Sequence, residues 1–192
     1  MKKDLQDSKL FTPYQMGPVT LRNRVIRSAA FESMGKDFGP TQDLKDYHGS
    51  VARGGVGMTT LAYASINRSG VSFNSQLWLR DEIVPQLRDI TEAVHNEGAA
   101  VGVQIGHCGN MTHWSTAGSF PVSASNGFNL YSPTFHRRMS HAEITQTAKD
   151  FGKAVHTAHE AGFDSVEVHA GHGYLISQFL SPWTNRRRDE FG

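Results

Sequence analysis

Apolar positions along the chain follow two alternating patterns, one typical of helices and one typical of strands. Residues 42–53 and 83–97 carry apolar side chains at helical spacing, and so does the segment from the capping-box sequence Ser140-His141-Ala142-Glu143 to His159. Short apolar runs rich in β-branched residues predict strands. These runs are centred on Val25-Ile26 and extend over residues 56–64, 99–105 and 165–168.

The order strand–helix therefore repeats, with glycine ahead of each later strand. This order favours a parallel sheet with right-handed crossovers, which is an α/β fold. Four such units equal half of an eight-stranded barrel, and a complete doubly wound sheet is the alternative. No strand is followed by G-x-G-x-x-G, so the dinucleotide-binding fingerprint is lacking.

Two segments interrupt the regular pattern. Residues 10–19 carry Pro13, Gly17 and Pro18 and predict irregular structure or a small hairpin. Residues 106–139 form a long loop, which we expect to cover an active site because such loops are usually functional. Residues 1–8 are expected to form a polar arm.

Composition narrows the classes of function. The chain has 192 residues with 19 Lys+Arg and 18 Asp+Glu, giving a formal net charge of +1, which does not indicate a nucleic-acid-binding protein. One cysteine excludes an internal disulfide framework and fits a reducing compartment. No apolar run is long enough for a membrane span, and the N-terminus lacks the apolar region of a secretory signal, so we expect a cytoplasmic location.

The densest group of reactive side chains follows the last predicted strand. The segment VEVHAGHGYLISQFLSP, residues 166–182, places His169, His172 and Tyr174 at and just beyond the carboxyl end of that strand. In α/β barrels and open sheets this end binds ligands. Two imidazoles and a phenol there are suited to hold a polarised oxygen and deliver a proton. The alternative is a pair of histidines satisfied by backbone groups in a tight turn.

Several other polar residues can be explained by a structural role as well as by a functional one. Gln104 reads from its position alone as a satisfied amide at a strand end. Cys108 reads as a small buried side chain, since no activating partner is identifiable. His107, Cys108 and His113 fit no zinc-ligand spacing. The run Arg186-Arg187-Arg188 predicts a solvated turn.

Several stretches resemble the old yellow enzyme family of FMN-dependent NAD(P)H oxidoreductases, whose members are (β/α)8 TIM barrels. The most specific stretch is HAGHGYLISQFLSPWTNRRRDEFG, which is similar to the family's histidine-pair, tyrosine and SP-x-x-N-x-R segment. Shorter matches occur at residues 10–11 with 21–27, 54–60 and 103–109. The resemblance implies that residues 1–192 are the N-terminal half of an FMN-binding TIM barrel, an incomplete domain with the first four β/α units.

The resemblance also implies a flavin site. Backbone groups of Ser28, Ala29 and Ala30 would lie against the flavin ring, and only the backbone of Tyr63 is expected to contact it. Gln104 would hydrogen-bond the pyrimidine edge of FMN, for which an amide is suited because it offers a donor and an acceptor.

The catalytic roles implied by the family fall on the histidine–tyrosine segment. His169 and His172 would bind the carbonyl oxygen of an activated alkene, and His169 would also contact the flavin. Tyr174 would protonate the α carbon while reduced flavin gives hydride to the β carbon; the phenol pKa of ~10 keeps it protonated at neutral pH. NADH or NADPH would reduce the flavin in the same pocket.

Three other expectations stay open at this stage. A metal-dependent barrel hydrolase would use His169, His172 and loop histidines. A non-catalytic fragment would serve as a binding module without turnover. Because a half barrel has two unpaired strand edges, two copies could also associate into a homo-oligomer that closes a barrel.

Overall fold

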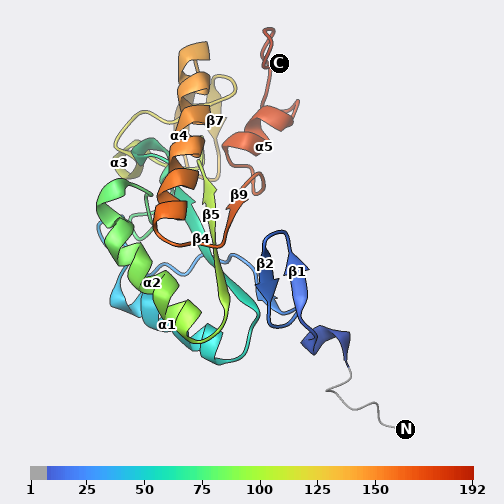
Figure 1. The fold of residues 1–192 in the computed structure, drawn as a ribbon. Helices are drawn as coiled ribbons and strands as arrows, with labels where there is room; N and C mark the ends of the chain where they lie inside the picture. Colours follow the sequence, from blue (N-terminus) through green and yellow to red (C-terminus); the bar gives the residue numbers. More distant parts are fainter. Residues whose placement is uncertain (1–7) are drawn as a thin grey trace.

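A computed structural model describes residues 8–192, so all but the last residue of the expected polar arm lies outside the described residues. A four-stranded parallel sheet in the order β3-β4-β5-β9 organises the fold (Figure 1). The strands are β3 (Ile26–Arg27), β4 (Met58–Ser65), β5 (Ala100–Gly106) and β9 (Ser165–Val168). The predicted alternation of strands and helices is confirmed.

Three long helices lie against one face of this sheet (Figure 1). They are α1 (Gln42–Arg53), α2 (Val84–Asn96) and α4 (His141–Glu160), and α2 is preceded by the 3-10 turn η4 (Asp81–Ile83). The bounds predicted for α1 are those observed. The predicted capping box is also formed, because Ser140 Oγ accepts from Glu143 N at 3.2 Å and Glu143 Oε2 accepts from Ser140 N at 2.8 Å.

The hydrophobic core lies between the sheet and these helices. It takes alternate residues of the strands, such as Leu61, Val101 and Val103, together with Leu87 and Ile90 of α2, all fully buried. Side chains that point to the opposite face do not meet a helix layer. Val168 on edge strand β9 is 51% exposed, so in the described residues the β9 edge is open.

Two smaller features flank the sheet. The segment predicted as irregular or a hairpin forms the antiparallel pair β1 (Tyr14–Met16) and β2 (Val19–Leu21) after the 3-10 turn η2 (Lys9–Phe11). After β4, the chain forms η3 (Arg68–Gly70). No helix in the described part of the chain has the length and apolar character needed to cross a membrane.

The segment 106–139 is not the unstructured loop that its length predicted. It contains α3 (Trp114–Ala117) and the short strands β6 (Val122–Ser123), β7 (Gly127–Asn129) and β8 (Thr134–Arg138), which pair in the order β6-β8-β7. The strands are too short for a clear alternation, and Val122 of β6 packs with Met139 and Leu175 in a small hydrophobic cluster. This small sheet covers the carboxyl end of β5 together with α5 (Leu175–Leu180), a helix that the sequence analysis did not predict.

The prediction of a solvated arginine turn is wrong for its middle residue. The Arg187 side chain is 0% exposed, and its Nη1 donates to the carbonyls of Ala124 (3.1 Å) and Met139 (2.8 Å). Its guanidinium also forms a bidentate pair with Asp189 at 2.8 and 2.7 Å. Charge alone could not distinguish this residue from its exposed neighbours, because the acceptors come from distant segments.

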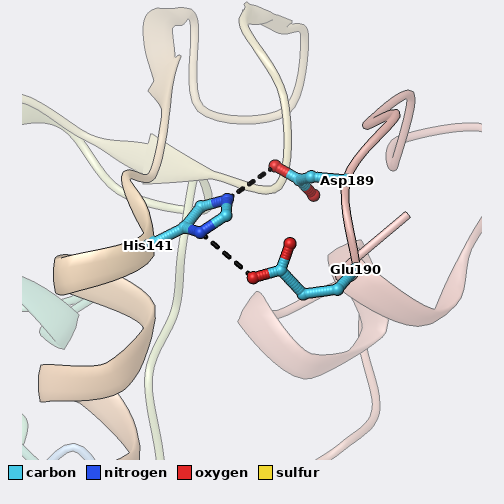
Figure 2. A group of neighbouring side chains, drawn as sticks. All are labelled: His141, Asp189 and Glu190. Carbon is cyan, nitrogen blue, oxygen red and sulfur yellow. Dashed lines mark hydrogen bonds and ion pairs between the residues drawn. The ribbon is translucent and has the colours of Figure 1, made fainter.

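Asp189 extends this interaction to α4. His141 lies between two carboxylates, with Nε2 3.0 Å from Asp189 Oδ2 and Nδ1 3.1 Å from Glu190 Oε1 (Figure 2). The C-terminal segment is thereby attached to the first turn of α4 and to the small sheet.

Replacing Arg187 with methionine should lower the free energy of unfolding by at least about 2 kcal/mol, because two buried carbonyls lose their donor. Urea unfolding followed by circular dichroism measures this. Arg188→Met is the matched control, since Arg188 is exposed, and should change stability by no more than about 0.5 kcal/mol. Equal effects of the two substitutions would contradict the structural role of Arg187.

Candidate functional site

The parallel register of β5 and β9 brings the histidine–tyrosine segment to the carboxyl end of the sheet. Gln104 is paired with Glu167 and Ile105 with Val168, and the chain continues so that His169 N donates to Ile105 O at 2.8 Å. His169 therefore lies beside the last residue of β5. Because the strands are parallel, the ends of β4 and β5 lie at the same edge.

Gly106 provides the space in which side chains from neighbouring strands meet. A Cβ atom at this position would lie 2.6 Å from Cε2 of Tyr63 and 3.2 Å from Cβ of His169. Tyr63 is on β4 and His169 follows β9, so the glycine between them allows both rings to approach the same point.

Tyr174 completes an aromatic group with these two residues. Its ring centroid is 5.1 Å from that of Tyr63 and 5.1 Å from that of His169, and the Tyr63 and His169 rings are 5.7 Å apart. Tyr63 is 5% exposed and its hydroxyl donates to Gly70 O at 2.7 Å. Its fixed ring thus forms a wall on which Tyr174 and His169 pack. The family resemblance implied a flavin contact for the Tyr63 backbone only, so this role of its side chain was not predicted.

The two histidines interact directly. His172 Nδ1 and His169 Nε2 are 3.1 Å apart, so one imidazole donates to the other. His172 is exposed and has a φ of +57°, a left-handed conformation in which histidine is among the less disfavoured residues. Burial, and secondly the charge of His172, lower the pKa of His169 below its usual value, so His169 is neutral at pH 7.

Tyr174 stands at the start of α5 and faces a cavity. It lines a space of about 550 Å³ with Ser72, Thr112 and Tyr131, among others. His172 lines a second cavity of about 760 Å³ beside the small sheet. Burial raises the pKa of Tyr174, so its phenol keeps its proton at neutral pH. A protonated hydroxyl beside a cavity has the state and the access that a proton donor needs.

The turn that presents these residues is held by backbone and amide groups. Leu175 N donates to His107 O at 2.9 Å, and Gln178, which is 2% exposed, donates through Nε2 to Cys108 O (3.1 Å) and Gly173 O (2.6 Å). Gln178 was not among the predicted site residues. Its position on a short helix gave no signal, because its partner Cys108 lies 70 residues earlier.

The remaining predicted positions lie at the same end of the sheet. Gln104 is 9% exposed and its Nε2 donates to Glu167 Oε1 at 2.5 Å, an interaction that the sequence analysis also missed. Ser28 and Ala30 are exposed and Ala29 is half-buried, directly after β3. The backbone of this segment is thus accessible.

The loop histidines and the cysteine do not join the histidine pair. His107 Nδ1 accepts from Gly109 N at 3.0 Å, and burial lowers the pKa of His107 to about 4. Cys108 is fully buried, as predicted, and burial raises the pKa of its thiol to about 12. His107 and Cys108 therefore contribute to the structure of this turn.

Within residues 8–192, one group of side chains has the spacing of a metal site: His141, Asp189 and Glu190 (Figure 2). Asp189 is already paired with Arg187, whose guanidinium pair is the main reason that the pKa of this carboxyl is far below its usual range. This group is an ion-pair cluster and lies apart from His169 and His172. The structure therefore gives no support to a metal site at the histidine pair.

Comparison with known proteins gives the sequence a clear set of relatives. Residues 9–192 match the model of the NADH:flavin oxidoreductase / NADH oxidase family. The chain is 37% identical over 183 residues to 4,4'-dithiodibutanoate disulfide reductase of Rhodococcus erythropolis, covering 95% of this chain and 45% of that protein. It is 35% identical over 189 residues to NADPH dehydrogenase of Listeria welshimeri, covering 96% and 55%.

Solved structures agree with this. The old yellow enzyme homologue from Zymomonas mobilis superposes with a TM-score of 0.89 at 29% identity, covering 96% of this chain and 55% of that one. Morphinone reductase in complex with tetrahydroNAD gives a TM-score of 0.90 at 29% identity, covering 97% and 56%. The chain spans about half the length of the relatives it matches, and the predicted α/β class of the TIM-barrel enzymes is confirmed over that span.

The pKa of His169 can be tested by NMR titration of the imidazole signals. We expect His169 to titrate below 6.5, because burial disfavours its charged form. His172→Ala should move the midpoint upward, since a neighbouring positive charge is removed. His156→Ala, at an exposed position on α4, should leave it unchanged. A midpoint above 6.5 in the unmodified chain would contradict the described environment.

Proposed function

Because the chain belongs to the NADH:flavin oxidoreductase / NADH oxidase family, we propose that it supplies the FMN site and catalytic residues of an NAD(P)H oxidoreductase that reduces activated C=C bonds. The observation that carries the proposal is the convergence of His169, His172 and Tyr174 beside Gly106. These side chains lie at the sheet edge where α/β barrels bind ligands.

The donor set at this edge fits a flat, polar ring. Gln104 offers an amide with a donor and an acceptor, and His169 adds a ring nitrogen. The exposed backbone of residues 28–30 offers a surface without large side chains. In this proposal Gln104 holds the pyrimidine edge of FMN, and residues 28–30 and the Tyr63 backbone lie against the ring. Gln104 is already oriented by Glu167.

Bound FMN would supply hydride, which it obtains from NADH or NADPH. His169 and His172 donate hydrogen bonds to the carbonyl oxygen of the alkene, and this withdraws electrons from the conjugated C=C bond. The direct contact between the two imidazoles fixes their relative orientation. Because a neutral imidazole carries one N–H and this contact uses one of them, both histidines donate to the oxygen only when the substrate replaces the contact.

Tyr174 delivers the proton that the reaction requires at the α carbon. Its raised pKa keeps the phenol protonated, and the cavity beside it admits a substrate. Packing on Tyr63 holds the ring in one orientation. Proton transfer from a positioned side chain contributes typically 10²–10⁴-fold to a rate.

The open edges of the sheet support a proposal for the domain organisation. We propose that residues 1–192 are the first four β/α units of a TIM barrel, with β3 and β9 as the edges that further strands would pair. Parallel strands are normally covered on both faces, which supports completion of the barrel by another four-unit half. Two copies of this chain are the alternative, and size-exclusion chromatography in the presence of FMN distinguishes a dimer from a monomer.

The experiment that tests the function is titration of the purified chain with FMN, followed by oxidation of NADPH in the presence of 2-cyclohexenone. A perturbed flavin absorption spectrum and enone-dependent NADPH oxidation are expected. A chain that leaves the spectrum of FMN unchanged would contradict the proposal. Stoichiometric zinc with activity lost to a chelator would point instead to the metal-dependent hydrolase.

Tyr174→Phe should slow reoxidation of the reduced flavin by enone about 100-fold and leave reduction of the flavin by NADPH unchanged. Only the reaction with the enone needs the proton from Tyr174. Stopped-flow absorbance separates the two half-reactions. Tyr14→Phe is the matched control, since Tyr14 is 43% exposed on β1 and does not line this cavity, and it should alter neither step. Equal enone rates in the Tyr174 variant and the unmodified chain would exclude Tyr174 as the donor.

A further inference from the structure

A buried group of charged side chains lies directly behind the exposed segment 28–30. It consists of Arg27, Glu32 and His48, whose side chains are 17%, 4% and 0% exposed. The proposed reaction uses none of them. Since burying charges costs several kcal/mol per ion, the group is a weak source of stability and invites a functional explanation.

Arg27, the last residue of β3, hydrogen-bonds Glu32, Thr60 and Ala30. Its Nη1 donates to Glu32 Oε1 at 2.6 Å and to Thr60 O at 2.6 Å, and its Nη2 donates to Ala30 O at 3.0 Å. One guanidinium thus ties the carbonyl of Ala30 to strand β4. The planar group has several donors in fixed directions, which a lysine ammonium cannot reproduce.

Glu32 connects the segment after β3 to strand β4 a second time. Its Oε1 also accepts from Ala62 N at 3.4 Å, so the carboxylate bridges the segment to β4 next to Tyr63. Ser33 follows with a φ of +57°, a left-handed conformation that serine rarely adopts. The chain therefore turns sharply just after Glu32, and this turn directs the carboxylate back beneath residues 28–30.

His48 lies beneath the carboxylate. Its Nδ1 is 2.9 Å from Thr59 Oγ1, while its Nε2 is 3.3 Å from Glu32 Oε1 in an alignment too poor for a hydrogen bond. No other described group hydrogen-bonds this nitrogen. The imidazole thus supports Glu32 from α1, where a fully buried histidine has no contact with solvent.

We propose that Arg27 and Glu32, supported by His48, are positioning residues that hold the backbone of residues 28–30 in place for the flavin ring. This inference rests on the proposed function. Ser28 and Ala30 are exposed, so no packing from outside fixes them. The guanidinium and the carboxylate join this segment to Thr60 and Ala62 of β4, and Phe31 stacks on Phe73 beyond that strand, with ring centroids 5.0 Å apart.

The pair also fixes the charge balance behind the ring. The charges of Arg27 and Glu32 offset each other at 2.6 Å. Removing Arg27 leaves a buried negative charge, which disfavours addition of electrons to a nearby flavin, whereas neutralising Glu32 leaves a positive charge, which favours it. The two changes therefore shift the flavin midpoint potential in opposite directions, which a general loss of structure would not do.

The test uses the full chain loaded with FMN and the variants Arg27→Met and Glu32→Gln. Measurements are the dissociation constant of FMN from fluorescence quenching and the midpoint potential from dye-coupled reduction. We expect Arg27→Met to weaken FMN binding at least about tenfold and to lower the potential. Glu32→Gln, which keeps an acceptor for Arg27 and Ala62, should bind FMN within about threefold of the unmodified chain and raise the potential.

The matched control is the ion pair of Arg53 and Glu97, which lies at the surface with Arg53 70% exposed. Arg53→Met and Glu97→Gln should change neither the affinity nor the potential. Circular dichroism without FMN verifies folding, and Glu32→Gln decides the matter if Arg27→Met does not fold. Potentials that stay unchanged, or that move in the same direction in both variants, overturn the inference. Failure of the unmodified chain to bind FMN would overturn the proposed function instead.

Discussion

The parallel pairing of β4, β5 and β9 is the constraint on which the site depends. Parallel neighbours end at the same edge, so residues more than 100 positions apart, Tyr63 and His169, meet there without any long-range side-chain attraction. Gly106 sits between them because a Cβ atom would occupy the space of both rings. The backbone register therefore determines which side chains meet at the site.

A second group of interactions holds the segments that carry the site residues. Gln178 and the backbone of residues 107–109 hold the turn that carries His172 and Tyr174, so polar contacts fix this turn together with the packing of Leu175. On the opposite side of the sheet, Arg27 and Glu32 do the same for residues 28–30. Both ends of the proposed flavin site thus rest on buried polar groups whose loss would leave unsatisfied partners.

Much of the fold could be predicted from local patterns. The bounds of α1 and β9 and the capping box at Ser140 follow from periodicity and from residues adjacent in the chain. The buried Arg187 could not be predicted, since its acceptors at residues 124 and 139 are brought near by tertiary structure. The small sheet within residues 106–139 also escaped, because strands of two to five residues carry too little alternation.

The same division applies to the site. The histidines and the tyrosine share one short segment, so their proximity is visible in the sequence. Glu167 lies two residues before His169 and on the same side of β9, and this alternation was a usable signal for its pairing with Gln104. No feature of the sequence indicated the role of the Tyr63 side chain, because a tyrosine in a buried strand is equally common in an ordinary hydrophobic core.

The left-handed backbone at His172 has a consequence for how this site can change during evolution. Histidine, asparagine and aspartate tolerate that conformation better than other residues with a side chain. Of the alternatives, asparagine keeps a neutral hydrogen-bond donor at the same place, whereas β-branched or bulky residues would force the turn to reshape. The geometry of the main chain thus confines natural variation at this position to a short set of side chains, most of which can still donate to an oxygen.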